Sequence, residues 1–136
     1  MIVVDTGPLV ALFDQRDRNH TLSRERFLAI RERMVTTLPV LTEAFHLLPA
    51  ASPAACQLRL FVERGGIAIH FSSYEEVARA MQLMIAYLDH PMDFADASVI
   101  ATAEALQTRR VFTNDRNDFE TYRIKRGHRT YPIEII

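Results

Sequence analysis

The sequence has little of several features that identify other classes of protein. Cys56 is the only cysteine, which excludes an internal disulfide framework and any zinc site built from several cysteines. We expect it to act as a small buried hydrophobic residue. The four glycines form no glycine-rich loop that could hold a phosphate: Gly7, Gly65, Gly66 and Gly127. Their spacing counts against a phosphatase-like α/β hydrolase that acts on small phosphoesters.

Long apolar segments and a strong net charge are also missing. No run of about 18 apolar residues occurs, and the first residues, MIVVD, carry no basic leader. We therefore expect a cytoplasmic protein without a membrane-spanning segment. The formal net charge of −1 argues against a general electrostatic attraction to nucleic acid. A length of 136 residues predicts a single domain over residues 1–136.

The charges are nevertheless unevenly distributed along the chain. Residues 34–108 hold three basic and eight acidic side chains, whereas residues 109–136 hold seven basic and four acidic ones. Four arginines and one lysine supply most of the basic excess: Arg116, Arg123, Lys125, Arg126 and Arg129. This segment is either a solvated polar loop or an arginine-rich patch that contacts phosphate, because the guanidinium group suits phosphate oxygens.

Short apolar segments alternate with segments of helical periodicity. The pattern predicts strands at residues 1–5, 34–37, 67–71, 110–113 and 131–136. It predicts helices at residues 7–15, 20–33, 39–48, 54–64, 72–88 and 94–106, with a linker at 49–55 and a polar turn at 114–119. This alternation is typical of the α/β class, with a mainly parallel central sheet of roughly five strands that helices cover on both faces.

The segment at residues 72–88 carries the clearest helix signals. Ser72 or Ser73 can cap its first turn, where two acidic residues, Glu75 and Glu76, favour the helix dipole. The face that we expect to meet the core carries four apolar side chains: Val77, Met81, Met84 and Leu88.

Acidic residues occur where carboxylates are unexpected or where ligands commonly bind. Asp5 ends the first predicted strand and Asp115 follows the fourth, which places both at the carboxyl edge of the sheet. Ligands of open α/β sheets bind at this edge, where the strand order reverses. Glu43 and Asp96 lie in helices whose other residues are nearly all apolar, and a buried carboxylate needs compensation.

Each acid also has a structural explanation. Asp5 can begin a turn, Glu43 can point to water, Asp93 can cap its helix, and Asp96 can favour the helix dipole. Taken together, however, a cluster of unpaired carboxylates repels itself and must either gain protons or bind a cation. Oxygen-only ligands fit Mg²⁺ or Mn²⁺.

Four segments carry a family resemblance in the correct order. MIVVDTGPLVALFD, LTEAF, DFADASVIATAEAL and VFTNDRNDF resemble the four acidic blocks of the PIN-domain ribonucleases and together span nearly the whole chain. Within that family the sequence is most similar to VapC-type toxins of toxin–antitoxin pairs. The resemblance implies a three-layer α/β/α sandwich, a Mg²⁺- or Mn²⁺-dependent endoribonuclease, a homodimer, an RNA substrate and a cognate antitoxin protein.

The resemblance also assigns roles to individual residues. Four acids match the catalytic and metal-binding positions of the family: Asp5, Glu43, Asp96 and Asp115. Asp93 is a further candidate metal ligand, ranked below Asp96 because it is less regular in the family. Asp118 ranks lower still, either as a residue of the turn or as one that supports a metal ligand.

Three further residues are candidate substrate contacts. Thr6 matches the hydroxyl that commonly follows the first acid, Asn114 matches the polar residue before the fourth, and Arg116 belongs to the basic segment. Gly7 departs from the family pattern, since a larger polar residue is frequent at this position.

In the expected reaction, a metal-bound water attacks a phosphodiester and no protein nucleophile is required. The alternative is a non-catalytic module with the same fold that binds RNA or a protein.

Overall fold

A five-stranded parallel sheet forms the centre of the computed structural model, which describes residues 1–136. Its strands are β1 (Ile2–Val4), β2 (Met34–Thr37), β3 (Ala68–His70), β4 (Arg110–Phe112) and β7 (Glu134–Ile135). They lie in the order β3-β2-β1-β4-β7. In the central strand, Val3 pairs with Val35 on one side and with Val111 on the other. The strand order therefore reverses between β1 and β4.

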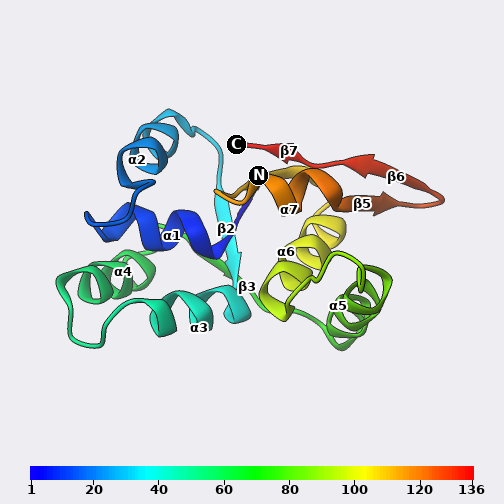
Figure 1. Cartoon of the computed structure of the whole chain (residues 1–136), viewed down its shortest axis with the longest axis horizontal. Helices are drawn as coiled ribbons and strands as arrows, with labels where there is room; N and C mark the ends of the chain where they lie inside the picture. The colour runs from blue at the N-terminus through cyan, green and yellow to red at the C-terminus, as the bar shows by residue number, and fades with distance from the viewer.

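Helices cover both faces of this sheet (Figure 1). They are α1 (Thr6–Phe13), α2 (His20–Ala29), α3 (Leu38–Leu47), α4 (Pro53–Glu63), α5 (Tyr74–Ala86), α6 (Phe94–Ala105) and α7 (Arg116–Thr121). Helix α1 packs with α2, α3 and α4 in one layer, and α5 and α6 form the other. The sequence-based predictions of an α/β class, a parallel sheet and five strands are confirmed. No helix is long and apolar enough to cross a membrane.

Helix α6 is apolar on nearly all sides because it lies between the sheet and a second helix. It contacts β1, β2 and β4 on one side and α5 on the other. Eight of its 12 residues are buried, four of them alanines: Ala95, Ala97, Ser98, Val99, Ile100, Ala101, Thr102 and Ala103. A helix enclosed in this way needs no polar face. Its N-terminus carries Asp93 and Asp96 to the carboxyl edge of the sheet.

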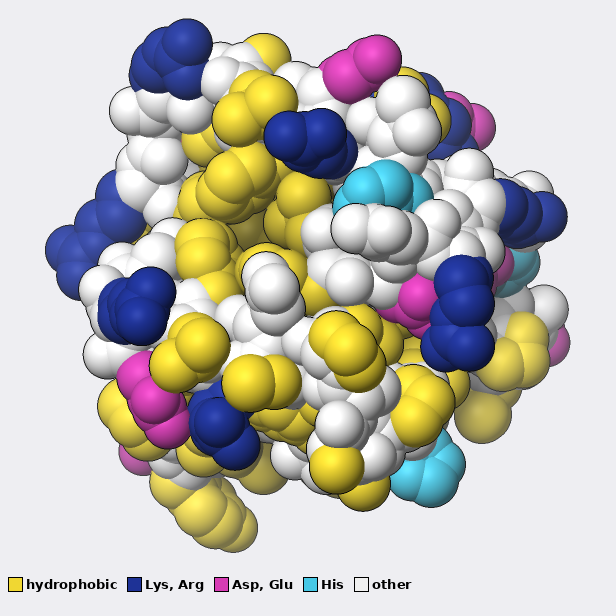
Figure 2. Space-filling model, turned by 90° about the vertical axis from the view of Figure 1, so that its left-hand side faces the viewer, with side chains coloured by type: hydrophobic (Ala, Val, Ile, Leu, Met, Phe, Trp, Pro, Cys, Tyr) yellow, Lys and Arg dark blue, Asp and Glu magenta, His cyan; other side chains and the backbone are white.

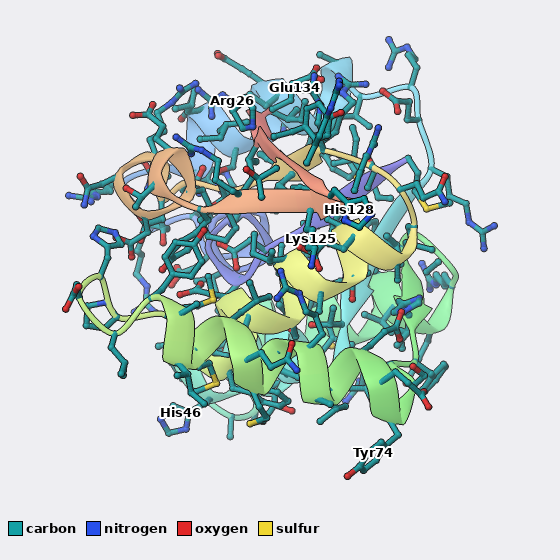
Figure 3. The ribbon with its side chains drawn as sticks, turned by 90° about the vertical axis from the view of Figure 1, so that its right-hand side faces the viewer. Arg26, His46, Tyr74, Lys125, His128 and Glu134 are labelled. Carbon is teal, nitrogen blue, oxygen red and sulfur yellow. The ribbon has the colours of Figure 1, made fainter.

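The C-terminal region differs from the predicted turn and single strand. Residues 114–119 were expected to form a polar turn, but Arg116–Thr121 is helix α7, which Asp115 caps and whose Phe119 is buried. Strand β5 (Arg123–Arg126) pairs antiparallel with β6 (Arg129–Pro132), so the expected strand at 131–136 is divided between β6 and β7. Figure 3 shows this hairpin lying over α6.

Two expectations about burial are wrong. Cys56 is exposed rather than buried. Helix α5 begins with the predicted Ser73 cap, but its buried residues are Ala80 and Leu83. Of the four side chains expected to meet the core, Val77 and Met84 are half-buried, whereas Met81 and Leu88 are 44% and 73% exposed. The small side chain of Ala80 permits the close packing of α5 on the alanine-rich helix α6, which the larger methionine would hinder.

Helix α4 provides a matched test of this burial pattern. We expect Leu58→Ala to lower the free energy of unfolding by about 2–5 kcal/mol, because Leu58 is fully buried and its loss leaves a cavity. Cys56→Ser should change it by less than about 0.5 kcal/mol, since its side chain is exposed. Urea unfolding of both variants measures the difference. Equal losses in the two variants would contradict the packing of α4.

Candidate active site

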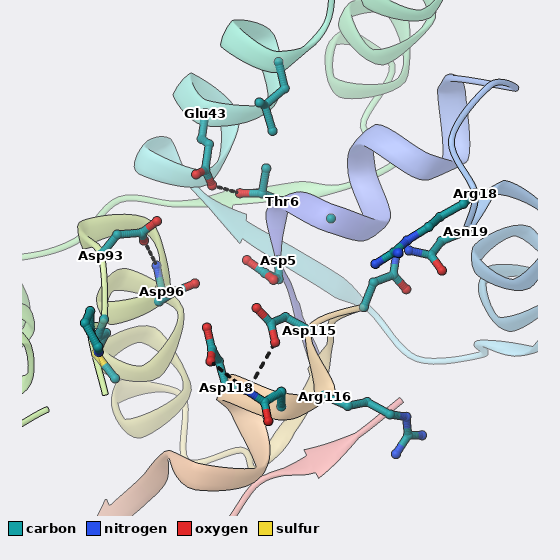
Figure 4. Close-up of a pocket in the computed structure, with 16 residues that line it drawn as sticks. Asp5, Thr6, Arg18, Asn19, Glu43, Asp93, Asp96, Asp115, Arg116 and Asp118 are labelled. Carbon is teal, nitrogen blue, oxygen red and sulfur yellow. Dashed lines mark hydrogen bonds between the residues drawn. The ribbon is translucent and has the colours of Figure 1, made fainter. Parts of the chain in front are cut away.

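Six acidic side chains from four separate parts of the chain line one open pocket of about 890 Å³ (Figure 4). They are Asp5, Glu43, Asp93, Asp96, Asp115 and Asp118. The pocket lies at the carboxyl ends of β1 and β4, where the strand order reverses. The structure thus places all five of the predicted metal ligands around the same pocket. The predicted substrate contacts Thr6, Asn114 and Arg116 line the same pocket.

Asp5 is the most deeply buried of these acids, at 6% exposure. It occupies the position before α1, but its side chain makes no capping hydrogen bond, so a role in starting that helix does not explain it. Its Oδ2 instead accepts a hydrogen bond of 2.8 Å from Thr113 Oγ1. Burial raises the pKa of Asp5 to about 6, against the opposing effect of the Thr113 hydrogen bond.

A threonine hydroxyl also holds Glu43. Thr6 Oγ1 donates a hydrogen bond of 2.5 Å to Glu43 Oε2, which joins the start of α1 to α3. The Glu43 side chain is half-buried and does not extend freely into water, although that was one of its sequence-based explanations. Because Thr6 is itself buried and follows Asp5 directly, this bond fixes the spacing between two of the acidic residues.

Asp93 and Asp96 have different environments although they share the first turn of α6. Asp93 caps the helix, because its Oδ1 accepts a hydrogen bond of 2.8 Å from the Asp96 backbone N–H. Asp96 has no such partner for its carboxylate in the structure. Burial, and then the negative charges of Asp5 and Asp93, raise the pKa of Asp96 to about 8.

The loop after β4 supplies the remaining acids. Thr113 Oγ1 accepts a hydrogen bond of 3.0 Å from the Asp115 backbone N–H, so one hydroxyl serves both Asp5 and Asp115. Asp115 Oδ1 in turn accepts from the Asp118 backbone N–H at 3.0 Å. His90 Nε2 lies 2.7 Å from Asp118 Oδ1 and connects α7 with the loop before α6. The expected polar turn is therefore an ordered part of the pocket.

The neighbouring polar residues are also ordered. Asn114 Nδ2 donates to Ser23 Oγ at 2.9 Å, which joins this loop to α2. A Cβ atom at Gly7 would lie 3.4 Å from Asn114 Cβ, so glycine permits α1 to approach the loop closely. Arg116 lies at the pocket rim, but Figure 4 shows its side chain extending away from the acids, and its nearest ionic partner is Glu120 at 3.7 Å.

The chemistry of this donor set fits a hard divalent cation. The ligand atoms on offer are carboxylate oxygens. Neither Asp5 nor Asp96 forms an ion pair in the structure, and burial raises the pKa of both. The acids surround the pocket without converging, because no three histidine, cysteine or acidic side chains are close enough to hold one ion. Metal binding would therefore require carboxylates to rotate inwards.

Sequence reasoning missed several residues that line the pocket or support its acids. Thr113 directly follows β4, as Asp5 follows β1, and its hydroxyl donates to Asp5. Its place at the end of a predicted strand was the one feature of the sequence that could have indicated this role. Arg18 and Asn19 also line the pocket, from the loop between α1 and α2. Nothing in the local sequence separates Arg18 from the neighbouring Arg16.

The family model of the PIN domain matches residues 2–125 of this chain. The chain belongs to the PIN-domain family. The expected family and fold are thus confirmed. Among known PIN-domain relatives, the chain is similar to Ribonuclease VapC26 of Mycobacterium tuberculosis, with 25% identity over 124 residues that cover 90% of this chain and 92% of the relative.

A solved PIN-domain structure shares the fold. The chain superposes on VapC20 of Mycobacterium tuberculosis, described as a sarcin-ricin loop cleaving toxin, with a TM-score of 0.76 and 19% identity. The match covers 85% of this chain and 92% of VapC20. The likeness in fold therefore extends over most of both chains.

Removing the Asp96 charge should stabilise the metal-free protein at alkaline pH. Folding raises the pKa of Asp96 from 3.8 to about 8. Between these two pH values the folded state binds more protons than the unfolded state, so the free energy of unfolding falls as the pH rises. At pH 8 we expect Asp96→Asn to be more stable than wild type by at least about 1.4 kcal/mol, the equivalent of one pKa unit. The gain should disappear towards pH 4.

Urea unfolding in a chelator at several pH values measures this gain. Asp89→Asn, at an exposed position outside the pocket, is the matched control and should show no such pH-dependent gain. A gain for Asp96→Asn that is independent of pH would contradict the assigned repulsion.

Proposed function

We propose that the chain, as a single nuclease domain over residues 1–136, is a cytoplasmic metal-dependent endoribonuclease and the toxin of a type II toxin–antitoxin pair. One observation carries the proposal: six acidic side chains from separate elements line one pocket at the strand-order reversal, and two of them have strongly raised pKa values. Perturbed carboxylates in a cleft are typical of a functional site. The names of VapC26 and VapC20 support RNA as the substrate.

The acidic residues that would hold Mg²⁺ or Mn²⁺ are Asp5, Glu43, Asp96 and Asp115, with Asp93 as a further ligand. When bound, the metal supplies a water that is nucleophilic at neutral pH and stabilises charge on the phosphate. The chain's own contribution is positional. Thr6 and Thr113 hold Glu43 and Asp5 through hydrogen bonds of 2.5 and 2.8 Å, so that these carboxylates do not swing into solvent.

Metal-dependent RNA cleavage tests the proposal. We expect the purified protein to cut RNA with Mn²⁺ or Mg²⁺ and not with a chelator. Asp96→Asn should lower the rate of RNA cleavage by at least about 100-fold. Removal of a group that only supports a metal ligand costs up to about 100-fold, and removal of a ligand itself should cost no less. Calorimetric titration with Mn²⁺ should show correspondingly weaker binding by this variant.

Asp89→Asn, purified in the same way, serves as the control for a contaminating nuclease and should cut RNA as wild type does. Identical cleavage by the wild type and Asp96→Asn would overturn the proposal. RNA binding without metal-dependent cleavage would favour the non-catalytic binding module instead.

A cognate antitoxin has a suitable surface on the face formed by α1, α2 and α4. A groove there is lined by apolar side chains, among them Leu12, Phe13, Phe27, Leu28 and Phe61. Figure 2 shows hydrophobic side chains gathered in a hollow on this face, with Lys and Arg side chains around it. We propose that an amphipathic segment of the antitoxin occupies this groove, as helices do in comparable apolar grooves.

Self-association has a separate candidate surface on α5. Three of its apolar side chains are exposed and recur at helical spacing, Tyr74, Met81 and Ile85. The exposed side chain of Leu88 follows in the turn after the helix. Tyr74 projects from the end of this helix (Figure 3). An exposed apolar stripe of this kind commonly marks an interface, and we propose that it meets the same stripe of a second copy in a homodimer.

Two matched substitutions separate the partner surfaces. Leu28→Asp, in the groove, should weaken binding of the co-expressed antitoxin at least tenfold (about 1.4 kcal/mol) and leave the dimer intact. Leu88→Asp, on the stripe, should yield a monomer that still binds the antitoxin. Calorimetry and sedimentation velocity measure the two effects. If Leu88→Asp lost antitoxin binding and Leu28→Asp kept it, the antitoxin would bind the stripe, and its assignment to the groove would be wrong.

A further inference from the structure

The α1–α2 loop carries a cation that points into the acidic pocket. Arg18 and Asn19 both line the pocket, and Figure 4 shows the Arg18 side chain extending from this loop towards the acidic side chains. Arg116 also lies at the rim, but extends in the opposite direction. Of the two rim arginines, Arg18 alone directs its guanidinium towards the acidic side chains.

Arg18 has no partner within the protein. Its guanidinium forms no hydrogen bond or ion pair in the structure, although it lies in a loop that contains two aspartates. Both of those carboxylates are engaged elsewhere: Asp14 Oδ1 accepts from the Arg16 backbone at 3.0 Å, and Asp17 Oδ1 accepts from the Asn19 backbone at 2.8 Å. The charge of Arg18 is therefore available to a ligand.

The loop that presents Arg18 is held firmly. The Asp17 backbone N–H donates to Asp14 O at 3.0 Å, and the His20 backbone N–H donates to Asp17 O at 3.0 Å. His20 Nδ1 also lies 2.7 Å from Ala11 O and joins the start of α2 to α1. The Asn19 side chain forms no capping hydrogen bond with α2, so its amide remains free beside Arg18. A rigid backbone lowers the entropy lost when such side chains bind.

A pocket lined by six acids repels the phosphates of RNA wherever a bound cation does not neutralise the acids, so a positive side chain outside the acid set would favour RNA binding. A guanidinium group donates two parallel hydrogen bonds to phosphate oxygens, and an amide adds a third donor. We propose that Arg18 and Asn19 form a subsite for a backbone phosphate of RNA next to the one that is cut. This inference rests on the proposed nuclease function and adds a substrate contact to it.

Binding of a labelled single-stranded RNA to an inactive background tests the subsite directly. Fluorescence anisotropy in Mg²⁺ would compare two double variants, Asp96→Asn/Arg18→Gln and Asp96→Asn/Arg16→Gln. Arg16 is the matched control, because it belongs to the same loop but pairs with Asp14 at 3.3 Å. We expect Arg18→Gln to weaken binding by about 5- to 20-fold. It should also lower the slope of log K against log salt by about 0.7, the value for one phosphate contact on a single strand. Arg16→Gln should change neither quantity.

Kinetics of the otherwise wild-type protein give an independent readout. Arg18→Gln should raise KM with little change in kcat, because the contact binds substrate and not the reacting atoms. Arg18→Lys should keep the salt slope but not the full affinity, since lysine retains the charge and loses the paired donors. Arg116→Gln should have the smaller effect on KM.

The outcomes separate this subsite from the proposed function. If the wild type cuts RNA and Arg18→Gln behaves as Arg16→Gln does, the subsite is wrong and the nuclease stands. If RNA binding depends on Arg18 but the wild type shows no metal-dependent cutting, the nuclease is wrong and the subsite stands. A wild-type protein that neither binds nor cuts RNA would overturn both.

Discussion

The hydrogen bond from Thr113 to Asp5 is the interaction on which the arrangement of the pocket depends. Asp5 lies at the end of the central strand, almost fully buried, where an unsatisfied carboxylate would be expensive. The same hydroxyl accepts from the Asp115 backbone, so β1, β4 and the start of α7 are joined at one atom. Thr6 extends the connection to Glu43 on α3. Two hydroxyl groups therefore set the positions of three acids.

The second constraint comes from the burial of α6. Because this helix is enclosed between the sheet and α5, its axis and rotation are fixed by packing, and its first turn cannot move away from Asp5. The core thus holds the Asp96 carboxyl near those of Asp5 and Asp93, and their negative charges, after burial, raise the pKa of Asp96. Burial is also the main cause of the raised pKa of Asp5. The charged carboxylates lower the free energy of unfolding, as is common where a site is arranged to bind a ligand.

The sequence predicted those features that depend on strong local patterns. Buried strands such as Ile2–Val4 are recognisable as apolar runs, and acids placed at strand ends or in apolar helices are conspicuous. Helix α7 was missed because one buried side chain, Phe119, and the Asp115 cap stabilise an otherwise polar segment. The hairpin β5–β6 was missed for a similar reason, since Ile124 is its only buried residue. Cys56 was misplaced although Leu58, two residues along the same helix, marks the buried side.

The charges at the rim show most clearly why sequence alone cannot complete the site. The basic excess near the C-terminus drew attention to residues 109–136, yet the cations there are partly used within the fold: Arg123 donates to backbone carbonyls at the end of α7, and Arg126 to Gln107 O. Arg18 belongs to no basic cluster, and two other charges in its loop satisfy each other. Whether an arginine is free to meet phosphate is decided by which acids its neighbours have already engaged. That property belongs to the folded loop, and residue counting along the chain does not detect it.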